Sequence, residues 1–214
     1  MGEVFALALA IAASPFPVVP AILLLFTVRP RPTSLAFLGA WYGGIGVVTA
    51  IFALLAEVID SSGPSPAWLS WVRIVAGAAL LAYGIRGWLT RATNGEPPAW
   101  VRSIQDATPP TAARLALVLS VANPKVLLLA AAAGLDIGAA GLTAATELAV
   151  VLAFAVVASI SVAVPVLGFA FAGARVLPPL RTATDWLLRN TAAVVAVVVM
   201  AIGLVLIKNG VTGL

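Results

Sequence analysis

The sequence predicts an all-α membrane protein, in which six transmembrane helices form two inverted three-helix repeats with broken first and fourth helices. Three observations lead to this fold class. Of the 214 residues, 62% are hydrophobic and only 9% are charged, whereas a soluble domain carries about 25% charged residues. Apolar segments of roughly 20 residues, the length of a spanning helix, recur along the chain. Prolines interrupt two of these segments, at corresponding positions in the two halves.

Six apolar segments are long enough to cross a bilayer. In chain order they are residues 4–28, 35–59, 68–89, 112–135, 142–172 and 186–207. The connections between them are rich in proline, glycine and charge, which favours loops. We therefore expect a first three-helix repeat at residues 1–92, a cytoplasmic linker at 93–111 and a second three-helix repeat at 112–214.

Basic residues lie mostly in alternate connections. Connections one, three and five hold nine of them: Arg29, Arg31, Arg86, Arg91, Arg102, Arg114, Arg175, Arg181 and Arg189. The opposite side holds two, Arg73 and Lys208. The positive-inside rule then predicts a multi-pass protein of the inner (plasma) membrane with both termini outside. The first charge is Glu3, and because a secretory signal begins with positive charge, residues 4–28 are expected to be a retained span.

An internal repeat relates the first and fourth spans. Residues 8–25 read ALAIAASPFPVVPAILLL and residues 115–132 read LALVLSVANPKVLLLAAA, so that Ser14-Pro15 matches Asn123-Pro124. Each break opens a block of three spans. A three-span block enters the membrane on one face and leaves on the other, so two such blocks in tandem must be inverted. Interrupted segments at corresponding positions of two halves indicate the binding site of a secondary transporter.

The two breaks need polar surroundings. Proline removes a backbone donor and displaces the carbonyl one turn earlier, and unsatisfied backbone groups are costly in hydrocarbon. We therefore expect both breaks to be buried in the bundle and to line a cavity. The predicted substrate-binding residues are Ser14, Pro15 and Pro17 in the first break and Asn123, Pro124 and Lys125 in the second.

Lys125 lies near the midpoint of the fourth span, where a charged lysine costs about 2.5–3.5 kcal/mol. It is expected to face an aqueous cavity or an acidic partner, where it would hold a carboxylate, phosphate or sulfate group or carry a coupling proton. Asp136 lies about 16 Å from Lys125 along a straight helix, which is too far for a direct ion pair. Glu147, in the fifth span, is therefore the second candidate for ion coupling. The structural alternative is a lysine bound by carbonyl groups of the broken helix.

Several function classes are excluded or disfavoured. The chain has no Cys and no His, so it has no disulfide, no thiolate or imidazole metal ligand and no Ser-His or Cys-His pair. The basic residues form no cluster with interleaved aromatic residues, which disfavours nucleic acid as a partner. We therefore expect no enzyme activity, cofactor or metal site. The glycines Gly39, Gly43 and Gly46 are expected to allow close helix packing rather than to bind a ligand.

The chain resembles the GAP (Sap) branch of the LysE transporter superfamily. The resemblance rests on a first helix reading ALAIAASPFPVVPAILLLF, on the short Arg-Pro connection after it, and above all on Asn123-Pro124-Lys125 in the fourth span. It implies a transporter fold and the delivery of glycolipids, such as glycopeptidolipids or sulfolipids, to the cell surface. Amino-acid exporters of the superfamily usually carry Pro-Gly-Pro in the first helix, whereas this chain reads Ser14-Pro15-Phe16-Pro17.

Three functions remain open from the sequence. The leading one is an inner-membrane exporter that moves a glycolipid or another anionic amphipathic substrate outward, with membrane lipids as its surroundings. The second is an exporter of amino acids or small polar metabolites. The third, of another class, is a non-transporting scaffold within a lipid-export complex. A homo-oligomer is compatible with each of them.

Overall fold

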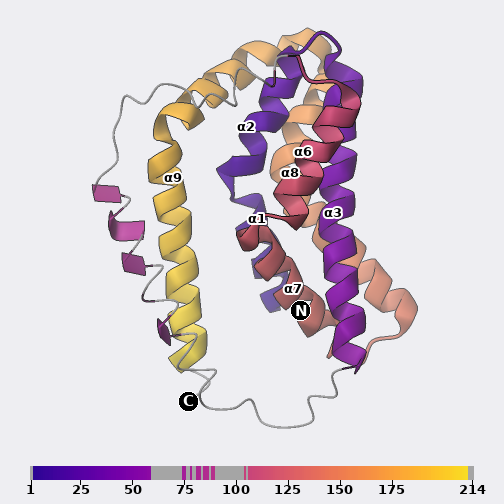
Figure 1. Cartoon of the computed structure of the whole chain (residues 1–214), viewed down its shortest axis with the longest axis vertical. Coiled ribbons are helices and arrows are strands. Elements are labelled where there is room, and N and C mark those ends of the chain that lie inside the picture. Colours follow the sequence, from indigo (N-terminus) through magenta and orange to yellow (C-terminus); the bar gives the residue numbers. More distant parts are fainter. Residues whose placement is uncertain are drawn as a thin grey trace. The chain divides into compact units, whose positions relative to one another are not determined.

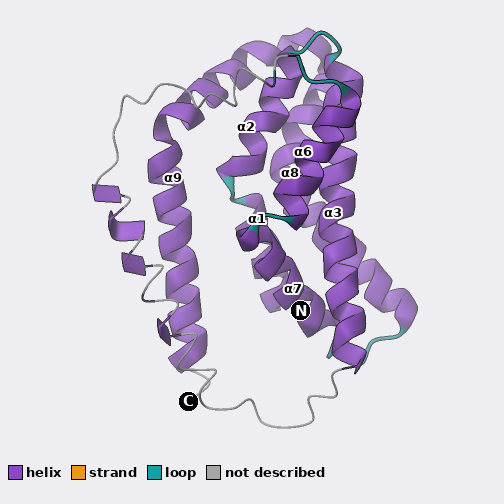
Figure 2. Cartoon of the chain, viewed as in Figure 1, coloured by secondary structure: helices purple, strands orange, loops and turns teal. Residues whose placement is uncertain are grey.

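The computed structural model of the chain describes residues 2–58, 104 and 106–211, together with residues 74, 75, 78, 81, 82, 84–86, 88 and 89. Every regular element in these residues is a helix (Figures 1 and 2). The helices are α1 (Gly2–Ala12), α2 (Pro15–Leu23), η1 (Leu24–Phe26), α3 (Pro30–Val58), α6 (Pro109–Val121), α7 (Pro124–Gly138), α8 (Ala144–Ala172), η2 (Gly173–Val176) and α9 (Leu177–Val211). The chain is thus an all-α membrane protein.

Two helical stretches, Pro30–Ala56 and Ala144–Trp186, are long and apolar enough to cross a membrane. Two further spans are present if each of two bent helix pairs counts as one, which gives up to four within the described residues. Most of the predicted third span, and most of the predicted linker at 93–111, lie outside the described residues. The six-span count therefore stays a prediction.

Prolines mark where many of these helices begin. α2, α3, α6 and α7 each start at a proline, and α9 has two prolines directly after its first residue. The first turn of a helix leaves its N–H groups without intrahelical partners, so a residue that lacks this group loses nothing there. The proline pair at 109–110 thus opens a helix. The stretch from Leu177 is likewise part of α9, which begins nine residues before the predicted sixth span.

The chain forms two compact units. The first combines Met1–Asp60 with Pro97–Asp185, and the second combines Ser61–Glu96 with Trp186–Leu214. Within the second unit, a Cβ atom added to Gly84 would lie 2.6 Å from the Met200 side chain and 3.0 Å from the Ala196 carbonyl. The described part of residues 74–89 therefore packs closely against α9.

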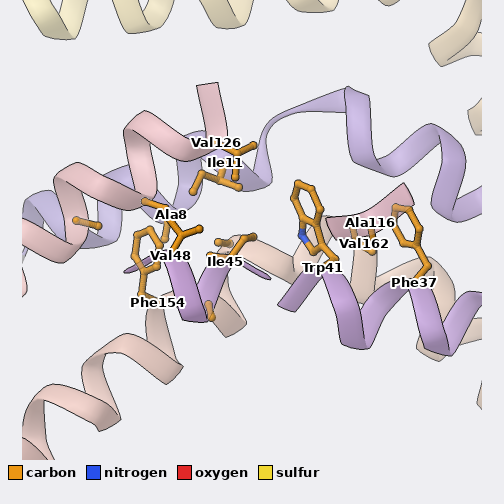
Figure 3. Close-up of a cluster of buried hydrophobic side chains, with 14 of the residues drawn as sticks. Ala8, Ile11, Phe37, Trp41, Ile45, Val48, Ala116, Val126, Phe154 and Val162 are labelled. Carbon is orange, nitrogen blue, oxygen red and sulfur yellow. The ribbon is translucent and has the colours of Figure 1, made fainter. Parts of the chain in front are cut away.

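In the first unit, α3 is the central helix and contacts α6, α7 and α8. Its side chains Phe37, Trp41 and Ile45 are fully buried, and Figure 3 shows them in the apolar core. α1 packs against α7 and α8. In Figure 1 the chain rises through α1 and α2, descends through α3, descends again through α6 and α7, and rises through α8. The two broken helices thus run in opposite directions.

Glycines let α7 approach α3 closely. A Cβ atom added to Gly134 would meet the carbonyl oxygen of Thr49, and one added to Gly138 would meet that of Ala53. Among the described residues, the expectation for Gly39 and Gly43 was wrong, because added Cβ atoms there meet nothing within 4 Å, whereas one at Gly46 would lie 3.8 Å from Ala155 of α8. The contact was assigned to the wrong glycines because spacing alone does not say which face of α3 meets another helix.

Candidate functional site

The first break separates α1 from α2, which are bent by 50° relative to each other. Ser14 is the buried residue between them, with φ −74° and ψ 123°. Within the described residues its side chain makes no capping bond to α2. Pro15 and Pro17 occupy two of the first three helical positions and have no N–H group, which leaves the Phe16 N–H as the one backbone donor at these positions. Prolines therefore end α1 and open α2 without a polar cap.

The second break separates α6 from α7, which are bent by 64°. Asn123 has φ −78° and ψ 114°, close to the values of Ser14. The shared conformation follows from the prolines, since a proline disfavours the helical conformation in the residue before it. The Lys125 backbone N–H donates to Asn123 Oδ1 at 3.0 Å, so Asn123 caps α7. Losing such a cap costs a helix about 1 kcal/mol.

The two breaks lie at the same level of the first unit. Ile11, just before the first break, lies beside Val126, just after the second, as Figure 3 shows. The half-helices α1 and α7 contact each other, whereas the half-helices α2 and α6 line opposite sides of a groove. The structure thus places the end of α1 beside the start of α7, while the binding role of the residues at the breaks stays a prediction.

Lys125 lies in the first turn of α7 and is half-buried. In the part of the chain that the structure describes, its amine makes no ion pair. The helical period places Leu129, Ala132 and Asp136 on the same face of α7, and this face is half-buried down to the exposed Asp136. A half-buried stripe therefore leads from the break to one end of the bundle, with a lysine at its start and an aspartate at its end.

Glu147 lies elsewhere. It is buried, with 9% of its surface exposed, and sits in the first turn of α8, beyond the far end of α7. α7 has 15 residues, so its two ends are about 20 Å apart. The structure does not bring Glu147 to Lys125. Its role in ion coupling stays a prediction, and such a role would require a path along α7 rather than a direct contact.

A groove lies between α2 and α6, and sequence reasoning missed it. Its volume is about 280 Å³. The lining residues are Phe16, Pro20, Ile104, Ala107, Thr111, Ala112, Leu115 and Leu119. Each wall shows a helical spacing of four residues, which was visible in the sequence. What the sequence could not show is that these two apolar faces, about a hundred residues apart, lie opposite each other.

Charge is distributed unequally between the two ends of the first unit. Five exposed arginines lie near the starts of α3, α6 and α9 and in η2, which share one end in Figure 1: Arg29, Arg31, Arg114, Arg175 and Arg181. The Arg181 guanidinium lies over the Phe26 ring, 5.0 Å from its centroid. The other end, where α1 starts and α7 ends, holds no lysine or arginine among the described residues. This end carries acidic residues instead: Glu3, Asp136 and Glu147.

The comparisons with known proteins agree with a lipid-related membrane protein. A protein-family model described as "Sap, sulfolipid-1-addressing protein" matches residues 4–212. The matched range includes both breaks, Lys125 and the α2–α6 groove. No curated protein and no solved structure matches the chain. The chain belongs to the family described as Sap, sulfolipid-1-addressing protein.

Proposed function

We propose that this protein is a secondary transporter that moves an anionic, amphipathic lipid from the cytoplasmic side of the inner membrane to its outer side. The observation that carries the proposal is the pair of helix breaks at one level of a bundle, in helices of opposite direction. Broken helices that meet near the midplane are how secondary transporters build binding sites from freed backbone groups.

Lys125 supplies the charge for such a site. A lysine amine at this depth is stabilised by an anion, and it lies at the N-terminus of α7, where the helix dipole also favours negative charge. A carboxylate, phosphate or sulfate group would therefore be attracted by both. Asn123 holds the break open, because its side chain caps α7.

Two observations favour a lipid over an amino acid or a small polar metabolite. The family is described as sulfolipid-addressing, and a sulfolipid combines an anionic group with long hydrocarbon chains. The groove between α2 and α6 has a predominantly apolar lining, which suits hydrocarbon and offers little to a polar solute. Membership of the LysE superfamily would agree with this function and stays a prediction.

The architecture that goes with this function has six spans in two inverted repeats. The opposite directions of the two broken helices support the inversion. The five arginines at one end support a cytoplasmic location of that end, and hence an outer location of the N-terminus.

Single cysteines test this orientation, since the chain has none of its own. Exposed residues near both ends can be replaced without removing a charge. We expect Gly2→Cys and Ala140→Cys to react with a membrane-impermeant maleimide in intact cells. Val28→Cys and Ala174→Cys should react only after permeabilisation, because they lie at the arginine-rich end. The reverse pattern would mean that the protein is inserted the other way.

Transport itself can be measured with the purified chain in lipid vesicles. A fluorescent sulfated glycolipid is placed in one leaflet, a proton gradient is imposed, and a quencher reports its arrival in the other leaflet. We expect faster transfer than in protein-free vesicles. Transfer at the protein-free rate would favour the scaffold function, and uptake of an amino acid without lipid transfer would favour the small-solute exporter.

A further inference from the structure

The groove between α2 and α6 reaches from the arginine-rich end to the level of the breaks. Ile104 and Ala107 line it near the start of α6, at the arginine-rich end. Phe16, two residues after Ser14, and Leu119, four residues before Asn123, line it at the break level. A molecule in the groove would therefore extend from one end of the bundle toward Lys125.

The lining selects hydrocarbon. Among the lining residues that the structure describes, Thr111 supplies the only side-chain hydroxyl, and it shares a hydrogen bond of 3.0 Å with the Thr108 hydroxyl. Phe16 leaves 48% of its surface exposed. In a membrane protein, such exposed apolar surface meets lipid. An acyl chain matches this lining, whereas a polar solute would find a single side-chain hydroxyl among the described lining residues.

A positive charge lies at the rim. Arg114 is exposed on α6, directly before the lining residue Leu115 and three residues after Thr111. On a helix this places it next to the groove wall, on the side that faces away from the core. A guanidinium binds sulfate or phosphate through two parallel hydrogen bonds. Asp106, the exposed acid in the turn beside Ala107, disfavours an anion on that side, so an anionic headgroup fits the Arg114 side.

We propose that this groove is the loading site of the transporter, where one acyl chain of an anionic lipid lies between α2 and α6 while its headgroup binds Arg114. The proposal rests on the proposed function for the identity of the cargo, but it concerns binding and can be tested without measuring transport. The proposal also implies the direction of movement, because the groove extends from the proposed cytoplasmic end to the breaks.

The experiment uses the full chain in nanodiscs with a sulfated glycolipid that carries a photoreactive diazirine on its acyl chain. After irradiation, peptides are mapped by mass spectrometry. We expect label on α2 and α6, and Leu115→Trp should reduce it at least about fivefold by filling the groove. Leu117→Trp is the matched control, because Leu117 is 45% exposed and lies outside the groove lining. Equal labelling in both tryptophan variants would overturn the proposal.

Arg114→Gln tests the headgroup separately and changes only an exposed side chain. It should weaken labelling by the sulfated lipid and leave labelling by a matched lipid with an uncharged headgroup unchanged. Equal loss for both lipids, or loss for neither, would refute the role of Arg114. Normal labelling together with absent transport in the unmodified chain would then reject the transport function while the binding site stands.

Discussion

Alanine in place of Gly134 is expected to lower the free energy of unfolding by about 2 kcal/mol, although it adds a single methyl group. The added Cβ would meet the carbonyl oxygen of Thr49, the Cβ of Phe52 at 2.8 Å and the nitrogen of Ala53 at 3.0 Å. Two of these atoms belong to the backbone of α3, which cannot turn aside as a flexible side chain can. α7 would have to move away from α3.

The measurement is thermal unfolding of the purified protein in one detergent. For a chain of this size, about 2 kcal/mol corresponds to a melting temperature lower by about 4–8 °C. Gly138→Ala should have a similar effect, because its Cβ would meet the Ala53 carbonyl. Gly43→Ala is the control, since it makes the same change on α3, where no described residue lies within 4 Å of the added Cβ. If all three variants melt together, α7 and α3 are not in close contact.

The helix breaks could be predicted from the sequence because their cause is local. A residue before proline avoids the helical conformation, whatever the rest of the chain does. Ser14 and Asn123 therefore adopt nearly the same extended backbone, with ψ of 123° and 114°. The prediction was incomplete at Pro109 and Pro178, which lie in predicted connections. There the proline-rich connections predicted loops, whereas in the structure both prolines lie in the first turns of helices.

The glycine contact and the groove could not be predicted, because they depend on which helices meet. The spacing of Gly134 and Gly138 was present in the sequence, but so was that of Gly39 and Gly43, which have no described neighbour within 4 Å of an added Cβ. Composition does not distinguish a small residue that contacts the backbone of a neighbouring helix from one that faces lipid. In the same way, no sequence pattern paired the apolar face at Phe16 with the one at Leu115, because only the fold places them opposite each other.

Methionine in place of Lys125 is expected to reduce lipid transfer by about tenfold or more, because a hydrogen bond to a charged group contributes about 1.5–3 kcal/mol. Methionine keeps the length of the side chain and removes its charge. Lys125→Arg should retain part of the transfer, since the guanidinium still attracts an anion. Lys208→Met is the control, because Lys208 is the only other lysine and lies in the last turn of α9.

Stability measured on the same variants separates a functional lysine from a structural one. If carbonyl groups of the broken α6 bound the amine as a structural contact, Lys125→Met would lower the melting temperature. We expect no loss of stability, since the described structure shows no ion pair for Lys125 and a charge at this depth is itself unfavourable. If Lys125→Met lowers lipid transfer but melts at the same or a higher temperature than the unmodified chain, Lys125 acts on the substrate rather than on the fold. Normal transfer with a lower melting temperature would assign Lys125 to the fold.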